Sequence, residues 1–100
     1  MSKFLIGIDV GTGSARAGLF DQSGNLVASA KRDIALFNRG PNLYEQSSND
    51  IWQAVAATVR EAVGTAGIDP GDVAGIGMDA TCSLVVIGPQ GSPLPVGDTD

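Results

Sequence analysis

The residues best suited to chemistry lie in the segment 5–25, LIGIDVGTGSARAGLFDQSGN, where an apolar run ends in an acid and a loop of glycines and hydroxyls follows. Glycines let a backbone approach an anion closely and point N–H groups at it, and the hydroxyls of Thr12 and Ser14 add neutral donors. Asp9 precedes this loop, and a carboxylate beside phosphates is repulsive unless a cation lies between them. The segment therefore suggests a phosphate-binding loop with Mg²⁺ at Asp9. Arg16 is a further candidate for a phosphate, because a guanidinium group forks onto oxyanions.

Two well-known glycine-rich motifs do not fit this loop. A dinucleotide-binding fingerprint begins with Gly11-x-Gly13, but its third small position holds Arg16, and the next turn follows too soon for the required helix. A P-loop needs Gly-x4-Gly-Lys-Ser/Thr, and the sequence contains no such string. A hairpin loop between antiparallel strands remains, either binding phosphate or forming a plain turn. In both cases Gly11 and Gly13 are expected to serve the geometry of the backbone.

Short apolar runs with turn residues between them predict the strands that position this loop. Residues 4–9, 15–20 and 26–32 are expected to form an antiparallel meander of three strands, with the turn DQSGN between the second and third. Two further strands are expected at 73–80 and 83–88. The intervening stretch up to the helix, including NRGP, is interpreted as a loop.

A helix is predicted to begin at Ser47 and to end at Gly64 or Gly67. Ser47 and Asp50 have the spacing of a capping box, and Asp50 favours the positive end of the helix dipole. Apolar side chains recur at helical spacing and are expected to face the core. They are Ile51, Trp52, Val55, Val59, Ala62 and Val63.

Composition excludes several kinds of function for these 100 residues, which suffice for at most one domain. The net charge of −5 and six scattered basic residues argue against nucleic acid or an anionic membrane as partner. With no histidine and one cysteine, a Ser-His-Asp or Cys-His arrangement and a cysteine-based zinc site are excluded within this chain. The first apolar run is too short for a signal peptide or a membrane span, so a cytoplasmic location is expected.

Three separated segments resemble one protein family in order and spacing. The pattern Asp-x-Gly-Thr-x-Ser-x-Arg is matched by Asp9, Gly11, Thr12, Ser14 and Arg16. The segments LYEQSSNDIW at 43–52 and GIGMDATCSLVVIG at 75–88 resemble two later motifs of the same family. The sequence thus resembles the N-terminal part of the FGGY carbohydrate kinases.

The resemblance implies an α/β chain with the actin-like, ribonuclease H-like fold, of which residues 1–100 form the first half of the N-terminal domain. It implies ATP and Mg²⁺ as cofactors, with the metal at Asp9. The implied phosphate contacts are Gly11, Thr12, Gly13, Ser14 and Arg16. The catalytic base, an aspartate in this family, is expected beyond residue 100, so residues 1–100 alone are expected to be inactive.

The end of the predicted strand 73–80 and the two residues after it carry the expected sugar-binding residues. The Asp-x-Thr arrangement of Asp79 and Thr81, followed by Cys82, is similar to the ribulokinase-like branch, whereas glycerol kinases carry an Arg-Glu pair where Ala80 and Thr81 are found. The resemblance implies a pentulose or pentitol such as ribulose or ribitol, with xylulose as an alternative. A polyol needs several hydrogen-bonding partners, which Asp79, Ala80, Thr81 and Cys82 are expected to supply. Cys82 also fits as a small packing residue.

Other interpretations stay open. A non-catalytic, actin-like nucleotide-binding or assembly protein would share the Asp-Gly-Thr loop, and its ATP turnover would not depend on a sugar. A stand-alone module of 100 residues is disfavoured, because the predicted strands leave a sheet with an exposed edge. Glu45 and Gln46 could face solvent, substrate or a neighbouring loop. The expected partner is a small sugar or polyol, and a homodimer is left open.

Overall fold

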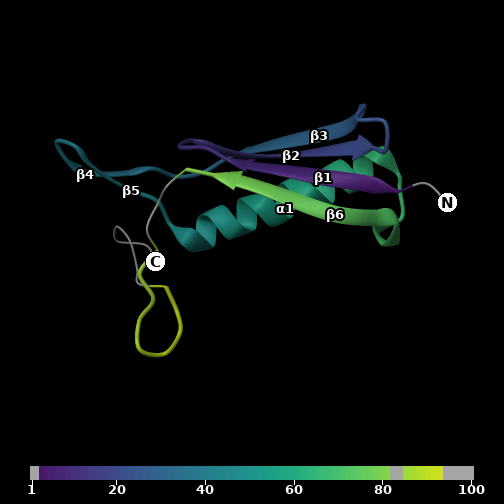
Figure 1. Ribbon diagram of the computed structural model, residues 1–100. Coiled ribbons are helices and arrows are strands. Elements are labelled where there is room, and N and C mark those ends of the chain that lie inside the picture. Colours follow the sequence, from purple (N-terminus) through teal and green to yellow (C-terminus); the bar gives the residue numbers. More distant parts are fainter. Residues whose placement is uncertain (1–2, 82–84, 94–100) are drawn as a thin grey trace.

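The structure, a computed structural model, describes residues 3–81 and 85–93. Over these residues the chain forms one four-stranded sheet, a separate two-stranded hairpin, one α-helix and a short 3₁₀ turn (Figure 1). The elements in chain order are β1 (Phe4–Val10), β2 (Ser14–Asp21), β3 (Leu26–Asp33), β4 (Phe37–Gly40), β5 (Leu43–Glu45), α1 (Ser48–Ala66), η1 (Pro70–Asp72) and β6 (Val73–Ala80).

The four-stranded sheet confirms the predicted meander and fourth strand. Its order is β3-β2-β1-β6, with β1 antiparallel to β2, β2 antiparallel to β3, and β6 parallel to β1. The turn after β2 is held by Asp21, whose carboxylate accepts the backbone N–H groups of Ser23 at 3.0 Å and Asn25 at 2.9 Å. This is the local hydrogen bonding that makes aspartate favourable in turns.

Helix α1 is bounded by two residues that were predicted as its ends, Ser47 and Gly67. Ser47 is the N-cap, and its hydroxyl accepts the backbone N–H of Asp50 at 3.1 Å. The Asp50 carboxylate does not complete a capping box, because it accepts the backbone N–H of Ala35 at 2.7 Å and so joins the helix start to the end of β3. Gly67 ends the helix in the left-handed conformation, with φ of 69°, which glycine adopts without steric cost.

The hydrophobic core lies between α1 and one face of the sheet. Alternating residues of the sheet point toward the helix, and α1 packs across β1, β2 and β3. The core consists of Ile6, Ile8, Val10, Ala15, Leu19, Ile34, Ala54 and Val55. β6 is an edge strand that α1 leaves largely uncovered, so its helix-side residues Ile76 and Met78 remain 61% and 62% exposed.

Three local expectations differ from the structure. The stretch expected to be a loop contains the β4–β5 hairpin, which projects from the end of the sheet (Figure 1); its turn includes Asn42 at φ 62°, a conformation that asparagine tolerates. Of the predicted strand 83–88, the described residues 85–88 form only an isolated bridge between Ile87 and Pro93. Trp52 was expected in the core but is 69% exposed, because it lies on the flank of α1 rather than on its buried stripe.

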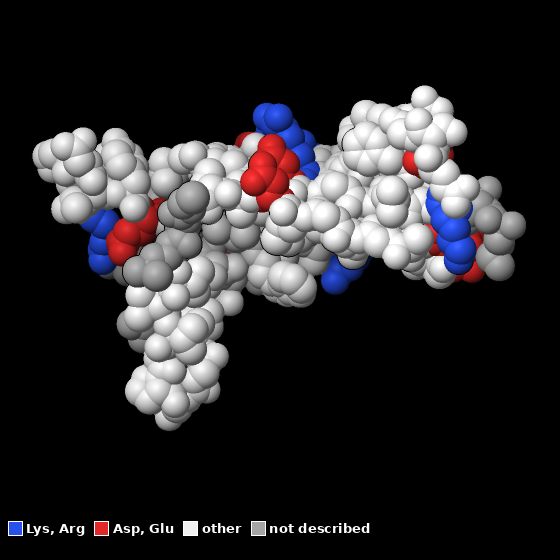
Figure 2. All heavy atoms as spheres, viewed as in Figure 1, with Lys and Arg blue, Asp and Glu red and all other residues white. Residues whose placement is uncertain are grey.

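Charged residues are dispersed over the surface. Figure 2 shows the basic side chains of one face as separate groups, several of them beside acidic ones. Lys31 and Arg32 are both exposed on β3, as expected for a solvated strand end. Within the described residues, no helix has the length and apolar character needed to cross a membrane.

Candidate functional site

The expected site residues gather at one end of the sheet. β1 and β6 run parallel and end together, and the loop after β1 and the start of α1 lie at this same end (Figure 1). The backbone N–H of Thr81, just after β6, donates to the carbonyl of Val10 at 3.1 Å and ties the two strand ends together. Ligands of open α/β sheets bind at the carboxyl ends of parallel strands, so this end is the candidate site.

The carbonyl groups of the loop between β1 and β2 accept hydrogen bonds that fix its shape. The backbone N–H of Gly11 donates to the carbonyl of Ser14 at 2.8 Å and closes the turn. The carbonyl of Gly13 accepts the N–H of Ile34 at 3.0 Å. The carbonyl of Thr12 accepts the side-chain amide of Gln46 at 2.8 Å. Segments distant in the sequence therefore shape this short loop.

The two loop glycines are not required by the conformation of the hairpin itself. Glycines with positive φ occur in the described part of the chain, but Gly11 and Gly13 are not among them, so the expectation that both serve backbone geometry is not supported. A Cβ added at Gly13 would meet no atom within 4 Å, and one at Gly11 would meet only the Ser14 carbonyl at 3.5 Å. The missing side chain of Gly13 leaves open space beside the loop, where an anion could approach the backbone.

Three charged residues share the face of the sheet opposite α1. Asp9 is paired in register with Asp79 on β6 and with Arg16 on β2, and all three residues are exposed. Paired residues of neighbouring strands point to the same face, so the two carboxylates and the guanidinium group face the same side. Among the described residues, no three His, Cys, Asp or Glu side chains gather as a metal cage. One or two carboxylates with substrate phosphates and water is, however, the usual Mg²⁺ arrangement, so Asp9 and Asp79 fit this ion.

The expected sugar-binding residues fall on two sides of β6. Ala80 is paired with Val10 and points toward the helix side, opposite to Asp79. Ala80 and Thr81 line an apolar pocket of about 260 Å³ beside the start of α1. The other lining residues are Val10, Gln46, Ser48, Ile51, Trp52, Val55, Met78 and Val85. Cys82 lies outside the described residues. The structure thus brings Asp79 next to Asp9, and Ala80 and Thr81 next to Trp52.

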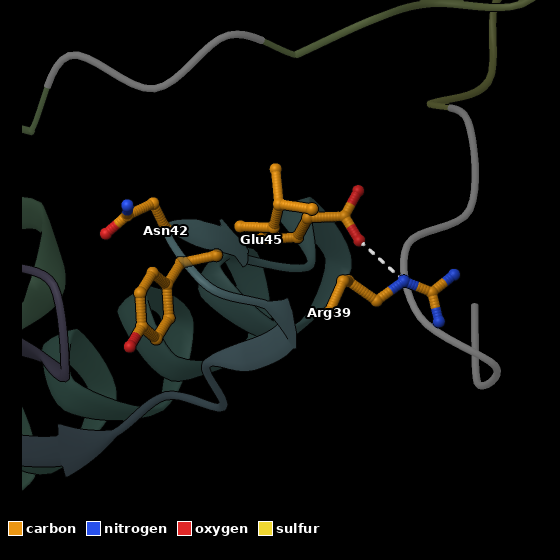
Figure 3. Close-up of a pocket in the computed structure, with 5 residues that line it drawn as sticks. Arg39, Asn42 and Glu45 are labelled. Carbon is orange, nitrogen blue, oxygen red and sulfur yellow. Dashed lines mark ion pairs between the residues drawn. The ribbon is translucent and has the colours of Figure 1, made fainter.

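A second hollow, of about 350 Å³, lies on the β4–β5 hairpin and is separate from the strand ends. It is lined by Arg39, Asn42, Leu43, Tyr44 and Glu45 (Figure 3). Arg39 and Glu45 form an ion pair at 3.1 Å with both side chains about half exposed. Exposed pairs of this kind contribute little to stability. In the structure Glu45 thus pairs with a residue of its own hairpin.

Gln46 is a residue with no assigned role in the sequence that the structure places against the loop after β1. Its amide nitrogen reaches the loop after β1, donating to the carbonyls of Thr12 at 2.8 Å and Gly11 at 3.4 Å. Of the possibilities left open, contact with a neighbouring loop is correct. The only signal in the sequence was its place in LYEQSSNDIW, directly before the N-cap Ser47.

Comparison with known proteins identifies the class of protein that this fold and site define. Residues 4–94 match the FGGY family of carbohydrate kinases, N-terminal domain. The chain belongs to this family, and its fold is the start of the actin-like ATPase fold predicted from the sequence.

Individual relatives agree with this assignment. A D-ribulokinase of Saccharomyces cerevisiae is 52% identical over 86 residues, which are 86% of this chain and 12% of the yeast protein. The structure of gluconate kinase from Lactobacillus acidophilus superposes with a TM-score of 0.86 and 28% identity, covering 95% of this chain and 19% of that one. A xylulose kinase from the same organism gives 0.84 and 29%, covering 93% and 19%. The chain therefore spans less than a fifth of the length of these relatives.

Proposed function

We propose that the full-length protein transfers the γ-phosphoryl group of ATP to a hydroxyl group of a small sugar or polyol. The observation that carries this proposal is the open space at Gly13, in the loop that follows the exposed carboxylate of Asp9. Glycines that the turn itself does not require are useful where phosphates must approach the backbone. Membership of the carbohydrate kinase family supports the same reaction.

In this proposal, the loop and the strand ends position the phosphates. Backbone N–H groups of residues 12–14 and the hydroxyls of Thr12 and Ser14 bind phosphate oxygens, and Arg16 adds a charged donor on the side of Asp9. Mg²⁺, held by Asp9 with Asp79 beside it, would offset the negative charge of the phosphate oxygens. Phosphoryl transfer depends mainly on positioning and on such electrostatic stabilisation. The base that accepts the sugar proton is expected beyond residue 100.

The acceptor that we propose is a pentulose or pentitol such as ribulose or ribitol. Support comes from the 52% identity with a D-ribulokinase over most of this chain. The Asp-x-Thr arrangement of Asp79 and Thr81 agrees with it, since these residues could hydrogen-bond sugar hydroxyls. The structural relatives named for gluconate and xylulose, at 28% and 29% identity, make these sugars competing candidates.

The test is ATP-dependent phosphorylation by the full-length protein over a panel of ribulose, ribitol, xylulose, gluconate and glycerol. We expect the highest kcat/KM for ribulose or ribitol. Preference for another sugar would keep the reaction and overturn the acceptor. ATP binding without turnover of any sugar would instead favour a non-catalytic, actin-like nucleotide-binding protein.

A further inference from the structure

The loop after β1 is fastened by a side chain that lies 34 residues further along the chain. Gln46 is half-buried between the end of β5 and the N-cap of α1. Its Nε2 atom donates to the carbonyl of Thr12 at 2.8 Å and, in a longer contact, to that of Gly11 at 3.4 Å. One amide group therefore holds two successive peptide groups of the loop.

The direction of these carbonyls fixes the direction of the amide hydrogens. In a planar trans peptide, the C=O of one residue and the N–H of the next point in opposite directions, and none of the described peptide bonds is cis. When the carbonyls of Gly11 and Thr12 turn toward Gln46, the N–H groups of Thr12 and Gly13 turn away from it. The Gly13 carbonyl accepts the N–H of Ile34, so the N–H of Ser14 points away from Ile34.

The position of Gln46 is itself secured by the elements around the loop. The Asp50 carboxylate, in the first turn of α1, accepts the N–H of Ala35 at 2.7 Å. The neighbouring residue Ile34 donates its own N–H to the Gly13 carbonyl at 3.0 Å. The chain after β3, the start of α1 and the loop are thus joined by a set of hydrogen bonds, to which Gln46 contributes its contacts with Gly11 and Thr12.

We propose that Gln46 is a positioning residue for phosphoryl transfer, which holds the Gly11–Thr12 carbonyls so that the following N–H groups are preorganised for phosphate. This inference rests on the proposed function. Gln46 acts on the loop as a donor, through its side-chain Nε2 atom. A carboxylate at this position has no such donor and would repel both carbonyls, which makes the isosteric Gln46→Glu change a sharp test.

The experiment compares full-length wild-type protein with Gln46→Glu and Gln46→Leu. The matched controls are Gln53→Glu and Gln53→Leu, because Gln53 is an exposed glutamine on the adjoining helix α1. Binding of Mg-ATP is measured by calorimetry, and kcat, the KM for the sugar and Tm are measured alongside. Losing one hydrogen-bonding anchor corresponds to about tenfold in an equilibrium constant. We expect the Kd for ATP to rise about tenfold or more and kcat to fall, with the sugar KM and Tm close to those of the controls.

The outcomes separate the two proposals. Unchanged ATP affinity in both Gln46 variants would overturn the positioning role, as would a loss of ATP affinity, sugar affinity and Tm together, which indicates a purely structural role. A wild-type protein that binds ATP but phosphorylates no sugar would overturn the proposed function alone, since the binding arm still tests Gln46. A wild-type protein that binds no ATP would overturn both.

Discussion

Asp9 and Asp79 occupy paired positions on the parallel strands β1 and β6, and both lie exposed on the face of the sheet opposite α1. Neighbouring strands are about 4.8 Å apart, so the two carboxylates leave the sheet side by side. Like charges at this spacing repel, and a divalent cation between them removes the repulsion. The register therefore places Asp79, on the strand proposed to bind the sugar, beside Asp9, the residue proposed to hold the metal.

Neutralising either carboxylate is expected to affect metal-dependent catalysis. In the full-length protein, Asp9→Asn should lower kcat by about 10²- to 10³-fold, the size typical for loss of an electrostatic contact to developing charge. Asp79→Asn should raise the Mg²⁺ concentration needed for half-maximal rate more than it raises the sugar KM. Steady-state kinetics at varied Mg²⁺ and sugar concentrations measures both effects. A change confined to the sugar KM would assign Asp79 to the sugar alone.

Gly13→Ala is expected to weaken ATP binding without changing the free energy of unfolding appreciably. Gly13 does not have positive φ, and an added Cβ meets no atom within 4 Å, so the unfolding free energy should change by no more than about 0.5 kcal/mol. The same methyl group would project into the space where phosphate must approach, so the Kd for ATP should rise. Urea unfolding and calorimetry measure the two quantities. Loss of stability without loss of ATP affinity would show that the glycine serves the hairpin instead.

The two glycines at the end of α1 should respond to alanine with opposite signs. Gly67 has φ of 69°, where a Cβ is strained, so Gly67→Ala should destabilise the fold by about 1 kcal/mol. Gly64 lies within the helix with nothing within 4 Å of an added Cβ, so Gly64→Ala should stabilise it by about 0.5 to 1 kcal/mol. Chemical denaturation of both variants provides the measurement. Equal signs would contradict the assigned end of the helix.

The pKa of Asp21 is lowered from its ordinary value of 3.8, first by the backbone N–H of Asn25, then by the Asn25 side chain, with a smaller contribution from the N–H of Ser23. A lowered pKa in the folded state means that the ionised carboxylate stabilises the fold above the unfolded-state pKa. This contribution is lost as the pH falls through the folded-state pKa. NMR titration of the Asp21 carboxyl carbon should therefore give a midpoint below 3.8. A midpoint at or above this value would mean that the turn hydrogen bonds do not persist in solution.

The sequence predicts most elements of this fold because their signals are local. Alternation in residues 15–20, the Ser47 cap and the terminal glycine of α1 each depend on neighbours in the chain, and all three appear in the structure. The exposure of Trp52 could not be predicted, because helical spacing identifies an apolar side but not where the sheet beneath it ends. The β4–β5 hairpin was not predicted, because its strands have only four and three residues and so show too little alternation.

In the candidate site, too, the features with local signals were predictable, and those that depend on the tertiary structure were not. Asp9 and the loop after it were recognisable from residue types at fixed spacing. The pairing of Asp9 with Asp79 depends on the register of a parallel pair of strands 70 residues apart, which short-range patterns do not contain. The role of Gln46 depends on two carbonyl directions, and no sequence pattern encodes these. The opposite orientation of Asp79 and Ala80 follows from strand alternation once the sheet is known.

The fastening of the loop through Gln46 and Ile34 also bears on the order of folding. Residues 11–14 lie in a hairpin that can close early, because its contacts are local. The carbonyls of Thr12 and Gly13 reach their partners only after β3 and the start of α1 have docked. A nascent chain that holds only the β1–β2 hairpin therefore lacks the finished loop. Any ligand that needs this loop would bind the fully docked domain in preference to earlier states, and would stabilise it by mass action.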